Sequence, residues 1–401
     1  MPQFLPFRGI RYVHGRVLDP VCAPPYDVIE AEERATLLAR DPHNSVRLIL
    51  PETYDGAAAA LSSWQAEGLL GTDETPSFSV YRMTFTDDSG RQRQTTGAIG
   101  ALAIEGLGTA ILPHERTLPK AKSDRLELLR ATRANTDPIW GLSLATGLSE
   151  LLSADAEPLT TARDDDGVVH ELFRLEASST VDAIARAVAG AALVLADGHH
   201  RFETASTYAA ERDADGCEDP GAHSIMALVV ELAPDELWVQ PIHRMVTGIE
   251  SRVLRDGLAE CFDVRPAGAN NPDGVAALVR EMTTTGALGL VDADGLALLV
   301  PRPELGNRMR DLPESMRDID AARFDVGVLP TLGSAEVTYR HDAAATAAHV
   351  DKGTVDAAIL LRAVTVDQIR GAADAGVRMP QKTTFFAPKP RTGMVFRSLD
   401  L

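Results

Sequence analysis

Apolar residues along the chain follow two spacings, one typical of strands and one typical of helices. Short apolar runs occur at 7–13, 45–50, 77–85, 95–104, 168–175 and 191–198. Apolar residues recur every three or four positions over 30–40, 57–70, 180–190 and 201–214. The first set predicts strands and the second predicts amphipathic helices. The polar stretch 87–94 separates two predicted strands and favours a hairpin there.

Predicted helices and strands also alternate in the last part of the chain. Helices are predicted over 250–262, 273–284, 343–351 and 365–376, and strands over 224–232, 237–246, 262–267, 337–341 and 357–364. Hairpins are expected over 287–301 and in the C-terminal segment 379–396. Because helices and strands alternate throughout, the predicted fold class is α/β (mixed α+β), with mixed sheets covered by helices.

A length of 401 residues with 45% hydrophobic content predicts a globular protein of roughly two or three structural units. We expect two packed subdomains. The first, over 1–150, is an N-terminal α/β region with a basic loop and helix. The second, over 151–401, is a C-terminal α/β region that contains the segment DGHHR and the closing hairpin.

The net charge of −19 excludes several classes of partner, because a protein with this charge repels nucleic acid and anionic membranes. The N-terminus lacks the apolar core of a signal peptide, and no apolar run approaches the roughly 18 residues of a membrane span. Three scattered cysteines predict neither a disulfide framework nor a zinc site. Together these features predict a cytoplasmic protein whose partner is a small molecule. They do not predict its oligomeric state.

The segment LVLADGHHRFETA carries the strongest chemical signal. A buried strand ends at Asp197-Gly198, and His199, His200 and Arg201 open a helix. A strand, a glycine turn and a helix point backbone N–H groups at an anion, and a guanidinium fork suits phosphate. A metal site is the rival interpretation, but adjacent histidines point in different directions and chelate poorly from one element. A purely structural turn is the third interpretation.

A basic cluster precedes this segment. It contains His114, Glu115, Arg116, Lys120, Lys122, Arg125 and Arg130, and it ends at Asn135. Ser123 or Asp124 can cap a helix that runs to about Asn135. The cluster is either a solvated helix face or a ligand-binding loop, and concentrated base in an acidic chain favours the loop.

Two further segments contribute candidates. In the C-terminal segment, Lys382 either reaches a ligand or belongs to a hairpin whose Phe385 and Phe386 pack into the core. In the N-terminal loop APPYDV, Asp27 is either a general base or a helix cap. Tyr26 accompanies it, and Asn44 and Arg47 follow in DPHNSVRL.

The segments ADGHHRFETA, APPYDV, NSVRLILP, HERTLPKAKSDRLELLRATRANTDPIWGL and MPQKTTFFAPKPRTGMVF resemble a bacterial and archaeal family catalogued as domain of unknown function 1015. The DGHHR loop is also similar to the corresponding loop of the ParB and sulfiredoxin-like superfamily, which includes free serine kinases that use ADP or ATP. This second resemblance implies a superfamily-like element around residues 197–201, with Asp197, Gly198, His199, His200 and Arg201 near nucleotide phosphates. It supplies no equivalent for the kinase's catalytic carboxylate.

The combined hypothesis is an enzyme that binds ADP or ATP and transfers a phosphoryl group to a small hydroxylated metabolite such as L-serine. Catalytic roles are assigned to Asp197, His199, His200 and Glu115, with Glu115 as the base. Nucleotide or phosphate binding is assigned to Gly198, Arg201, His114, Arg116, Lys120, Lys122, Arg125, Arg130 and Lys382. Substrate binding is assigned to Tyr26, Asp27, Asn44, Arg47 and Asn135.

No protein-held metal is expected, while Mg²⁺ carried by the nucleotide stays open. Two alternatives to the kinase are a phosphate-ester hydrolase, such as a phosphoserine phosphatase, and a non-catalytic nucleotide-binding sensor.

Overall fold

The computed structural model describes residues 1–104, 107–115, 123–153, 157–217, 219 and 221–400. These residues form two compact units. The described residues of unit 1 fall within 1–113, 119–238 and 388–401, and those of unit 2 fall within 114–118 and 239–387. Each unit combines sheets with helices, which confirms the predicted mixed α/β class.

The division differs from the expected boundary at residue 150. A single nine-stranded sheet of unit 1 takes strands from both sides of that position. Strands that are hydrogen-bonded neighbours in one sheet belong to the same unit. The polar connection after residue 150 is therefore a loop within unit 1 and not a boundary between domains.

The nine-stranded sheet is mixed and has the order β6-β11-β8-β12-β5-β4-β10-β9, with β1 paired to β5. Its strands are β1 (Phe4–Leu5), β4 (Phe78–Thr86), β5 (Gln92–Ala103), β6 (Ile111–Pro113), β8 (Ile139–Ser143), β9 (Thr160–Arg163), β10 (Val169–Leu175), β11 (Leu193–Asp197) and β12 (Ser224–Glu231). The pairs β11–β6 and β12–β8 are parallel, and the other pairs are antiparallel.

The predicted hairpin between β4 and β5 is confirmed. Thr86 pairs with Gln92, and Oδ1 of Asp87 accepts hydrogen bonds of 3.0 Å from the backbone N–H groups of Ser89 and Arg91. An aspartate that bonds its own turn in this way is typical of such polar loops.

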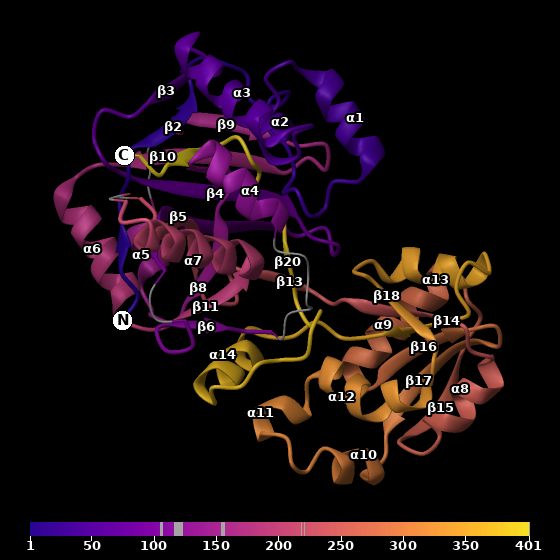
Figure 1. The fold of residues 1–401 in the computed structure, drawn as a ribbon. Helices are drawn as coiled ribbons and strands as arrows, with labels where there is room; N and C mark the ends of the chain where they lie inside the picture. Colours follow the sequence, from indigo (N-terminus) through magenta and orange to yellow (C-terminus); the bar gives the residue numbers. More distant parts are fainter. Residues whose placement is uncertain (105–106, 116–122, 154–156, 218, 220, 401) are drawn as a thin grey trace. The chain divides into compact units, whose positions relative to one another are not determined.

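Three helices pack on one face of the large sheet (Figure 1). They are α5 (Leu148–Leu151), α6 (Ser178–Ala189) and α7 (His199–Ala214). Leu148, Ile184, Val188, Phe202 and Ala205 of these helices are buried in a core shared with the strands. This packing fixes α7, whose first turn carries the DGHHR segment.

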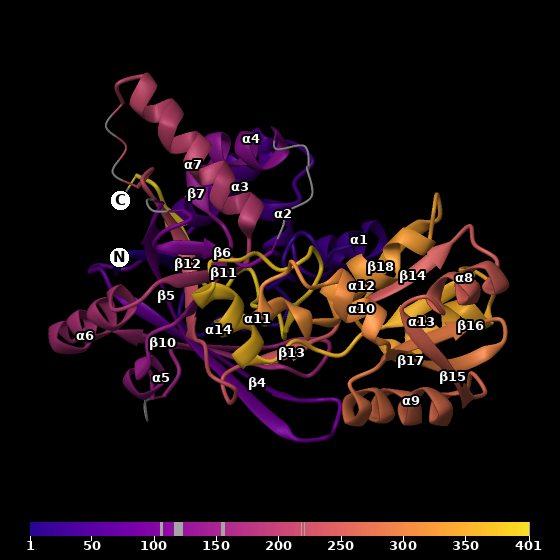
Figure 2. The ribbon, with the colours of Figure 1, turned by 90° about the horizontal axis from the view of Figure 1, so that it is seen from below.

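A second sheet of unit 1 is antiparallel and has the order β3-β2-β21-β7. Its strands are β2 (Gly9–Tyr12), β3 (Leu70–Thr72), β7 (Ala134–Asn135) and β21 (Phe396–Ser398). The remaining helices of unit 1 are α1 (Ala31–Arg40), α2 (Val46–Ile49), α3 (Tyr54–Ala66) and α4 (Ser123–Thr132). Helix α4 contacts both α3 and α7 (Figures 1 and 2).

The strand predicted over 45–50 is wrong, because these residues form the short helix α2. Oδ1 of Asn44 accepts a hydrogen bond of 2.9 Å from the backbone N–H of Val46 and so supports the first turn. Val46, Leu48 and Ile49 are all fully buried. Periodicity cannot distinguish a strand from a helix when every apolar residue in a short run is buried.

Unit 2 is built on an antiparallel six-stranded sheet with the order β15-β17-β16-β19-β14-β18. Its strands are β14 (His243–Thr247), β15 (Phe262–Gly268), β16 (Leu288–Asp292), β17 (Gly295–Pro301), β18 (Glu336–Arg340) and β19 (Ala357–Leu360). Its helices are α8 (Ser251–Leu258), α9 (Pro272–Thr285), α10 (Pro303–Arg308), α11 (Glu314–Arg317), α12 (Asp320–Gly327), the 3-10 helix η1 (Leu329–Thr331), α13 (Ala343–Asp351) and α14 (Val366–Asp374). Apolar residues of α9 and α13 form a core with this sheet.

The closing hairpin predicted over 379–396 is also wrong. Strand β20 (Phe385–Ala387) pairs with β13 (Trp238–Gln240), whereas β21 pairs with β2 and β7. The two C-terminal strands, β20 and β21, therefore belong to different sheets. Phe386 is buried as expected, and Phe385 stacks on His341 with ring centroids 4.4 Å apart.

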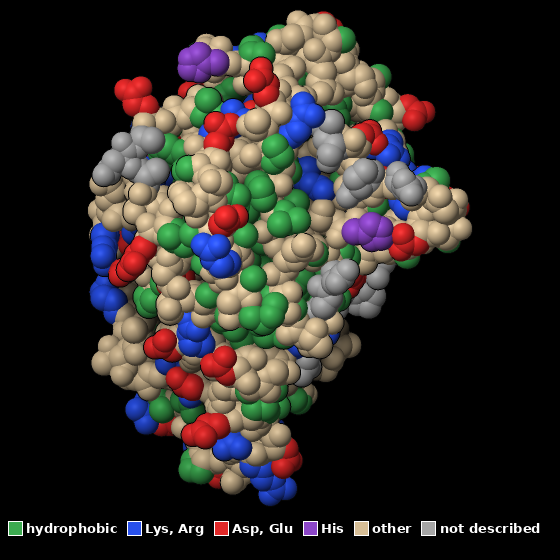
Figure 3. Space-filling view, turned by 90° about the vertical axis from the view of Figure 1, so that its left-hand side faces the viewer, with side chains coloured by type: hydrophobic (Ala, Val, Ile, Leu, Met, Phe, Trp, Pro, Cys, Tyr) green, Lys and Arg blue, Asp and Glu red, His purple; other side chains and the backbone are tan. Residues whose placement is uncertain are grey.

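The described part of the chain contains no helix that is both long and apolar enough to cross a membrane. On the face drawn in Figure 3, Lys and Arg side chains are interspersed with Asp and Glu side chains. Charge of both signs is therefore mixed on this face.

Candidate functional site

The predicted junction of strand, glycine and helix is confirmed in unit 1. Strand β11 ends at Asp197, Gly198 has a φ of +89°, and α7 begins at His199. A Cβ atom on residue 198 would lie 2.6 Å from Cγ2 of Ile139. Both the backbone angle and the close approach therefore require glycine at this position.

Gly198→Ala should lower the free energy of unfolding by at least about 2 kcal/mol, because strain at positive φ adds to a steric clash. Gly90→Ala is the matched control, since Gly90 has a φ of +81° and a Cβ there would meet nothing within 4 Å. Urea denaturation of both variants measures the difference. Equal losses would show that the contact with Ile139 costs nothing.

Arg201 lies at the centre of an ion-pair cluster. Its guanidinium pairs with Asp137, contacts Oδ2 of Asp197 at 2.8 Å and donates to the carbonyl of Pro138 at 2.7 Å. Nζ of Lys389 lies 2.9 Å from Oδ1 of Asp197. Two cations thus hold the Asp197 carboxylate, one on each oxygen.

The cluster fixes the charge states of its members. Burial opposes ionisation of Asp197, but the charges of Lys389 and Arg201 outweigh it and hold the pKa of Asp197 well below its ordinary value. Burial similarly opposes the charge of Arg201, while Asp137 and Asp197 raise its pKa further. Asp197 is therefore an anion that holds the two cations in place, and it is a poor general base at neutral pH.

The N-terminal loop reaches the same place. The ring of Tyr26 lies 4.4 Å from the guanidinium carbon of Arg125 and 6.0 Å from that of Arg201. The adjacent Asp27 is exposed and interacts electrostatically with Arg201. Asp27 is not a helix cap, because α1 begins after Glu30 and has no side-chain cap.

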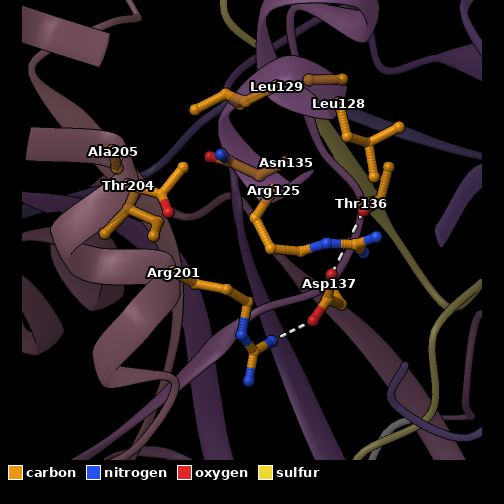
Figure 4. Close-up of a pocket in the computed structure, with 11 residues that line it drawn as sticks. Arg125, Leu128, Leu129, Asn135, Thr136, Asp137, Arg201, Thr204 and Ala205 are labelled. Atoms are coloured by element: carbon orange, nitrogen blue, oxygen red, sulfur yellow. Dashed lines mark hydrogen bonds and ion pairs between the residues drawn. The ribbon is translucent and has the colours of Figure 1, made fainter. Parts of the chain in front are cut away.

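A pocket that is open to solvent borders the cluster (Figure 4). Its walls come from α4, the segment 134–137, α7 and β12. The lining residues are Arg125, Leu128, Leu129, Ala134, Asn135, Thr136, Asp137, Arg201, Thr204, Ala205 and Ile225. One part of the pocket is charged and the other is largely aliphatic.

The two histidines of the motif stand in the first turn of α7. Nδ1 of His200 lies 3.9 Å from Oε2 of Glu203, and His199 contributes to the electrostatic field at Asp197. Among the described residues, no group of three or more His, Cys, Asp or Glu side chains is placed to hold a metal ion. The histidines are thus positioned beside the cluster, as potential hydrogen-bond donors to an anion.

Glu115 belongs to unit 2 and is not among the residues that line this pocket. Its carboxylate accepts hydrogen bonds from the backbone N–H groups of Lys382, Thr383 and Thr384 at 3.0, 3.0 and 2.8 Å, and from the Thr384 hydroxyl at 2.7 Å. Burial opposes its ionisation, yet His114 and Thr384 lower the pKa of Glu115 to about 2. A carboxylate held in this way is too weakly basic to act as the general base, which is the role that the sequence suggested for Glu115.

Two other candidates belong to the same cluster in unit 2. Nε2 of His114 lies 2.7 Å from Oγ1 of Thr384 and 3.2 Å from Oε1 of Glu115. Lys382 has a φ of +57° and contributes its backbone N–H to Glu115. Their contacts support a structural role, in which the segment 382–384 binds the Glu115 carboxylate as a nest binds an anion.

Three more candidates lie outside the pocket. Asn44 is buried and donates to the carbonyls of Pro20 and Cys22. Arg47 donates to the carbonyl of Leu38, and Arg130 pairs with glutamates on α4 and α7. Arg116, Lys120 and Lys122 lie outside the described residues.

Sequence reasoning did not select Asp137, Lys389 or Thr204. Asp137 follows Asn135 and Thr136 in a polar stretch before a strand, and a carboxylate there is a natural partner for a nearby arginine. Lys389 stands between two prolines seven positions after Lys382, so composition alone could not separate the two lysines.

The family model described as "Protein of unknown function (DUF1015)" matches residues 4–322. The chain belongs to the DUF1015 family. No curated protein matches this DUF1015 chain. The resemblance seen in its sequence motifs is thereby confirmed at the level of the family.

Several solved structures are similar to this DUF1015 protein. A conserved hypothetical protein from Pyrococcus furiosus has 13% identity and a TM-score of 0.37, over 72% of this chain and 92% of that one. A free serine kinase in complex with AMP has 14% identity and a TM-score of 0.36, over 69% and 84%. SbnI with a C-terminal truncation, from Staphylococcus aureus, has 11% identity and a TM-score of 0.35, over 73% and 85%. Identities of this size do not establish an activity, so the function has to be argued from the site itself.

Proposed function

We propose that the pocket beside Arg201 binds a nucleotide, ADP or ATP, and that the protein transfers a phosphoryl group to the hydroxyl of a small metabolite such as free L-serine. The observation that carries the proposal is the convergence of Arg125 and Arg201 on one pocket, with Arg201 in the first turn of α7. Guanidinium groups and a helix N-terminus are the groups that proteins use to hold phosphates.

The arrangement of charges at the site supports an anionic ligand. Asp137 and Asp197 hold Arg201 and Lys389 in place, and Arg125 pairs at 2.6 Å with Asp124, whose side chain is 57% exposed. Phosphoryl transfer depends mainly on positioning of the reactants and on neutralisation of the phosphate charge. Cations that carboxylates already hold in place provide both without having to move.

Asp27 is the carboxylate best suited to accept the proton of the attacking hydroxyl. It is exposed beside the pocket, and it forms no ion pair with another described residue. In the proposed step, the substrate oxygen forms a bond to the terminal phosphorus, and the bond from that phosphorus to the bridging oxygen breaks. The nucleotide leaves with one phosphate fewer, and the hydroxyl proton passes to Asp27.

Magnesium, when present, would enter with the nucleotide and neutralise its phosphate charge. Asp137 and Asp197 are both engaged by Arg201, so neither is available for a protein-held metal ion. Among the described residues, the neutralising role therefore falls to Arg125, Arg201 and Lys389.

The test is a binding and turnover experiment on the whole chain. ADP or ATP should raise the melting temperature, because a ligand that binds only the native state stabilises it. Incubation with L-serine should then yield O-phosphoserine, detected by ³¹P NMR. Asp27→Asn should retain nucleotide binding and reduce turnover at least about a hundredfold, the usual scale of general-base catalysis.

Glu33→Gln is the control, because Glu33 is an exposed residue on the neighbouring helix α1. Absence of any nucleotide-dependent shift would contradict the proposal. Nucleotide binding without turnover of any hydroxylated metabolite would favour a sensor, and release of phosphate from phosphoserine without nucleotide would favour a hydrolase.

A further inference from the structure

Asn135 presents an oriented donor to the pocket. The residue is 7% exposed, and its Oδ1 accepts hydrogen bonds from the backbone N–H of Met226 at 2.9 Å and from Arg397 at 3.0 Å. These two donors fix which end of the amide is oxygen. The Nδ2 group has no acceptor among the described residues, and Figure 4 shows the amide end extending across the pocket toward Ala205.

Thr204 supplies a second polar group that faces the pocket. The residue is 6% exposed and lines the pocket. Ser206 and Thr207, on the same helix, satisfy their hydroxyls by donating to the carbonyls four residues earlier, at 3.0 Å each. The hydroxyl of Thr204 makes no such bond within the described chain. Neither polar atom is fully enclosed by protein, so both face the open pocket and can hydrogen-bond to an occupant.

The surroundings of these two groups are aliphatic. Leu128 and Leu129 of α4, Ala205 of α7 and Ile225 of β12 line the same pocket. An occupant of this part must therefore bury apolar surface and also offer hydrogen-bonding atoms at its edge. A flat heterocycle meets both needs, because its faces are apolar and its edge is polar.

We propose that this part of the pocket binds the base of the nucleotide, with Nδ2 of Asn135 and the hydroxyl of Thr204 contacting the edge of the ring. This inference rests on the proposed function, and it names the residues that select the base. Because Oδ1 of Asn135 already accepts two hydrogen bonds, its amide acts as a donor only. The subsite therefore favours a base that presents a ring nitrogen or a carbonyl oxygen to Asn135.

Two nearly isosteric variants test the assignment. Thr204→Val removes the hydroxyl and keeps the shape of the side chain. Asn135→Asp keeps an oxygen for Met226 and Arg397 but removes the donor. Ser206→Ala is the matched control, because its hydroxyl is already bonded within α7.

Isothermal titration with ADP and with pyrophosphate, which lacks a base, separates the two parts of the ligand. Thr204→Val should weaken ADP binding about three- to tenfold, and Asn135→Asp about tenfold or more, with pyrophosphate binding unchanged. Ser206→Ala should leave both affinities unchanged.

The inference is overturned if ADP and pyrophosphate bind the unmodified protein equally well. It is also overturned if Thr204→Val binds ADP as the unmodified protein does, or if the variants weaken both ligands to the same extent. Each of these results still allows the unmodified protein to bind phosphate groups, so the proposed function survives. Failure of the unmodified protein to bind either ligand would instead reject the proposed function and the base subsite with it. If Asn135→Asp does not fold, Thr204→Val decides alone.

Discussion

Arg201→Ala should lower the free energy of unfolding of unit 1 by about 3–5 kcal/mol and abolish nucleotide binding. The change leaves Asp137, whose side chain is 10% exposed, without its cation, and it leaves Asp197, which is 23% exposed, with Lys389 alone. Removing one member of a buried charge cluster costs far more than the cluster contributes, because the remaining charges lose their compensation. Arg201→Lys keeps the charge but cannot span both carboxylates, so it should recover only part of the loss.

Tryptophan fluorescence during urea denaturation measures this effect selectively. The three tryptophans, Trp64, Trp140 and Trp238, all belong to unit 1. Arg130→Ala is the control, since Arg130 makes solvent-exposed ion pairs and such pairs contribute little. A midpoint for Arg201→Ala that equals the midpoint of this control would show that the cluster is not a structural element of the site.

Glu115→Gln should lower the stability of unit 2 by about 3 kcal/mol at neutral pH without acting on chemistry. The neutral amide cannot replace a carboxylate that accepts three backbone hydrogen bonds and one from a hydroxyl. If Glu115 were the catalytic base, the variant would lose turnover and keep its stability. The opposite result is expected, with folded Glu115→Gln retaining nucleotide binding and turnover at low temperature.

The pH dependence gives an independent check. The pKa of Glu115 is about 2 in the folded protein, below its ordinary value of 4.5. The unfolded chain therefore takes up the proton first as the pH falls, and the stabilisation from Glu115 disappears between about pH 4.5 and pH 2. The difference in stability between the unmodified protein and Glu115→Gln should be constant above this window and shrink within it.

Acid denaturation followed by far-UV circular dichroism measures that difference. Glu281→Gln is the control, because Glu281 is exposed on α9 of the same unit. A Glu115→Gln curve that runs parallel to the unmodified curve throughout the acid range would contradict the assignment of a carboxylate bound in its ionised form.

The sequence was informative wherever a local signal and a buried environment agree. Asp197-Gly198 after an apolar run predicted the junction at α7, because only glycine tolerates a φ of +89° beside Ile139. Tyr26 and Arg201 are predicted from two separate segments, and Arg125 and Asn135 from the basic cluster between them. The structure brings Arg125, Asn135 and Arg201 to one pocket, with Tyr26 stacked against the two arginines.

The site predictions that differ from the structure share a physical reason. The path of the chain in three dimensions determines which residues come into contact. Lys382 and Lys389 look alike in sequence, yet the chain passes from unit 2 to unit 1 between residues 387 and 388. Lys389 consequently reaches Asp197, while Lys382 donates its backbone N–H to Glu115 and accepts a hydrogen bond from Arg244 at its carbonyl. Glu115 was chosen for its basic neighbours, but its environment is determined by a segment about 270 residues later, which no local pattern reveals.

The last strand has a consequence for synthesis of the protein. Strand β21 lies between β2 and β7 rather than at an edge, and Lys389 stands just before it in the chain. A nascent chain that ends at residue 387 carries every described residue of unit 2 but lacks this strand and this cation. Proteins usually fold from the N-terminus while the ribosome is still elongating the chain. Unit 1 therefore completes this sheet and the cation cluster at Asp197 only after the segment that contains Lys389 and β21 has been synthesised.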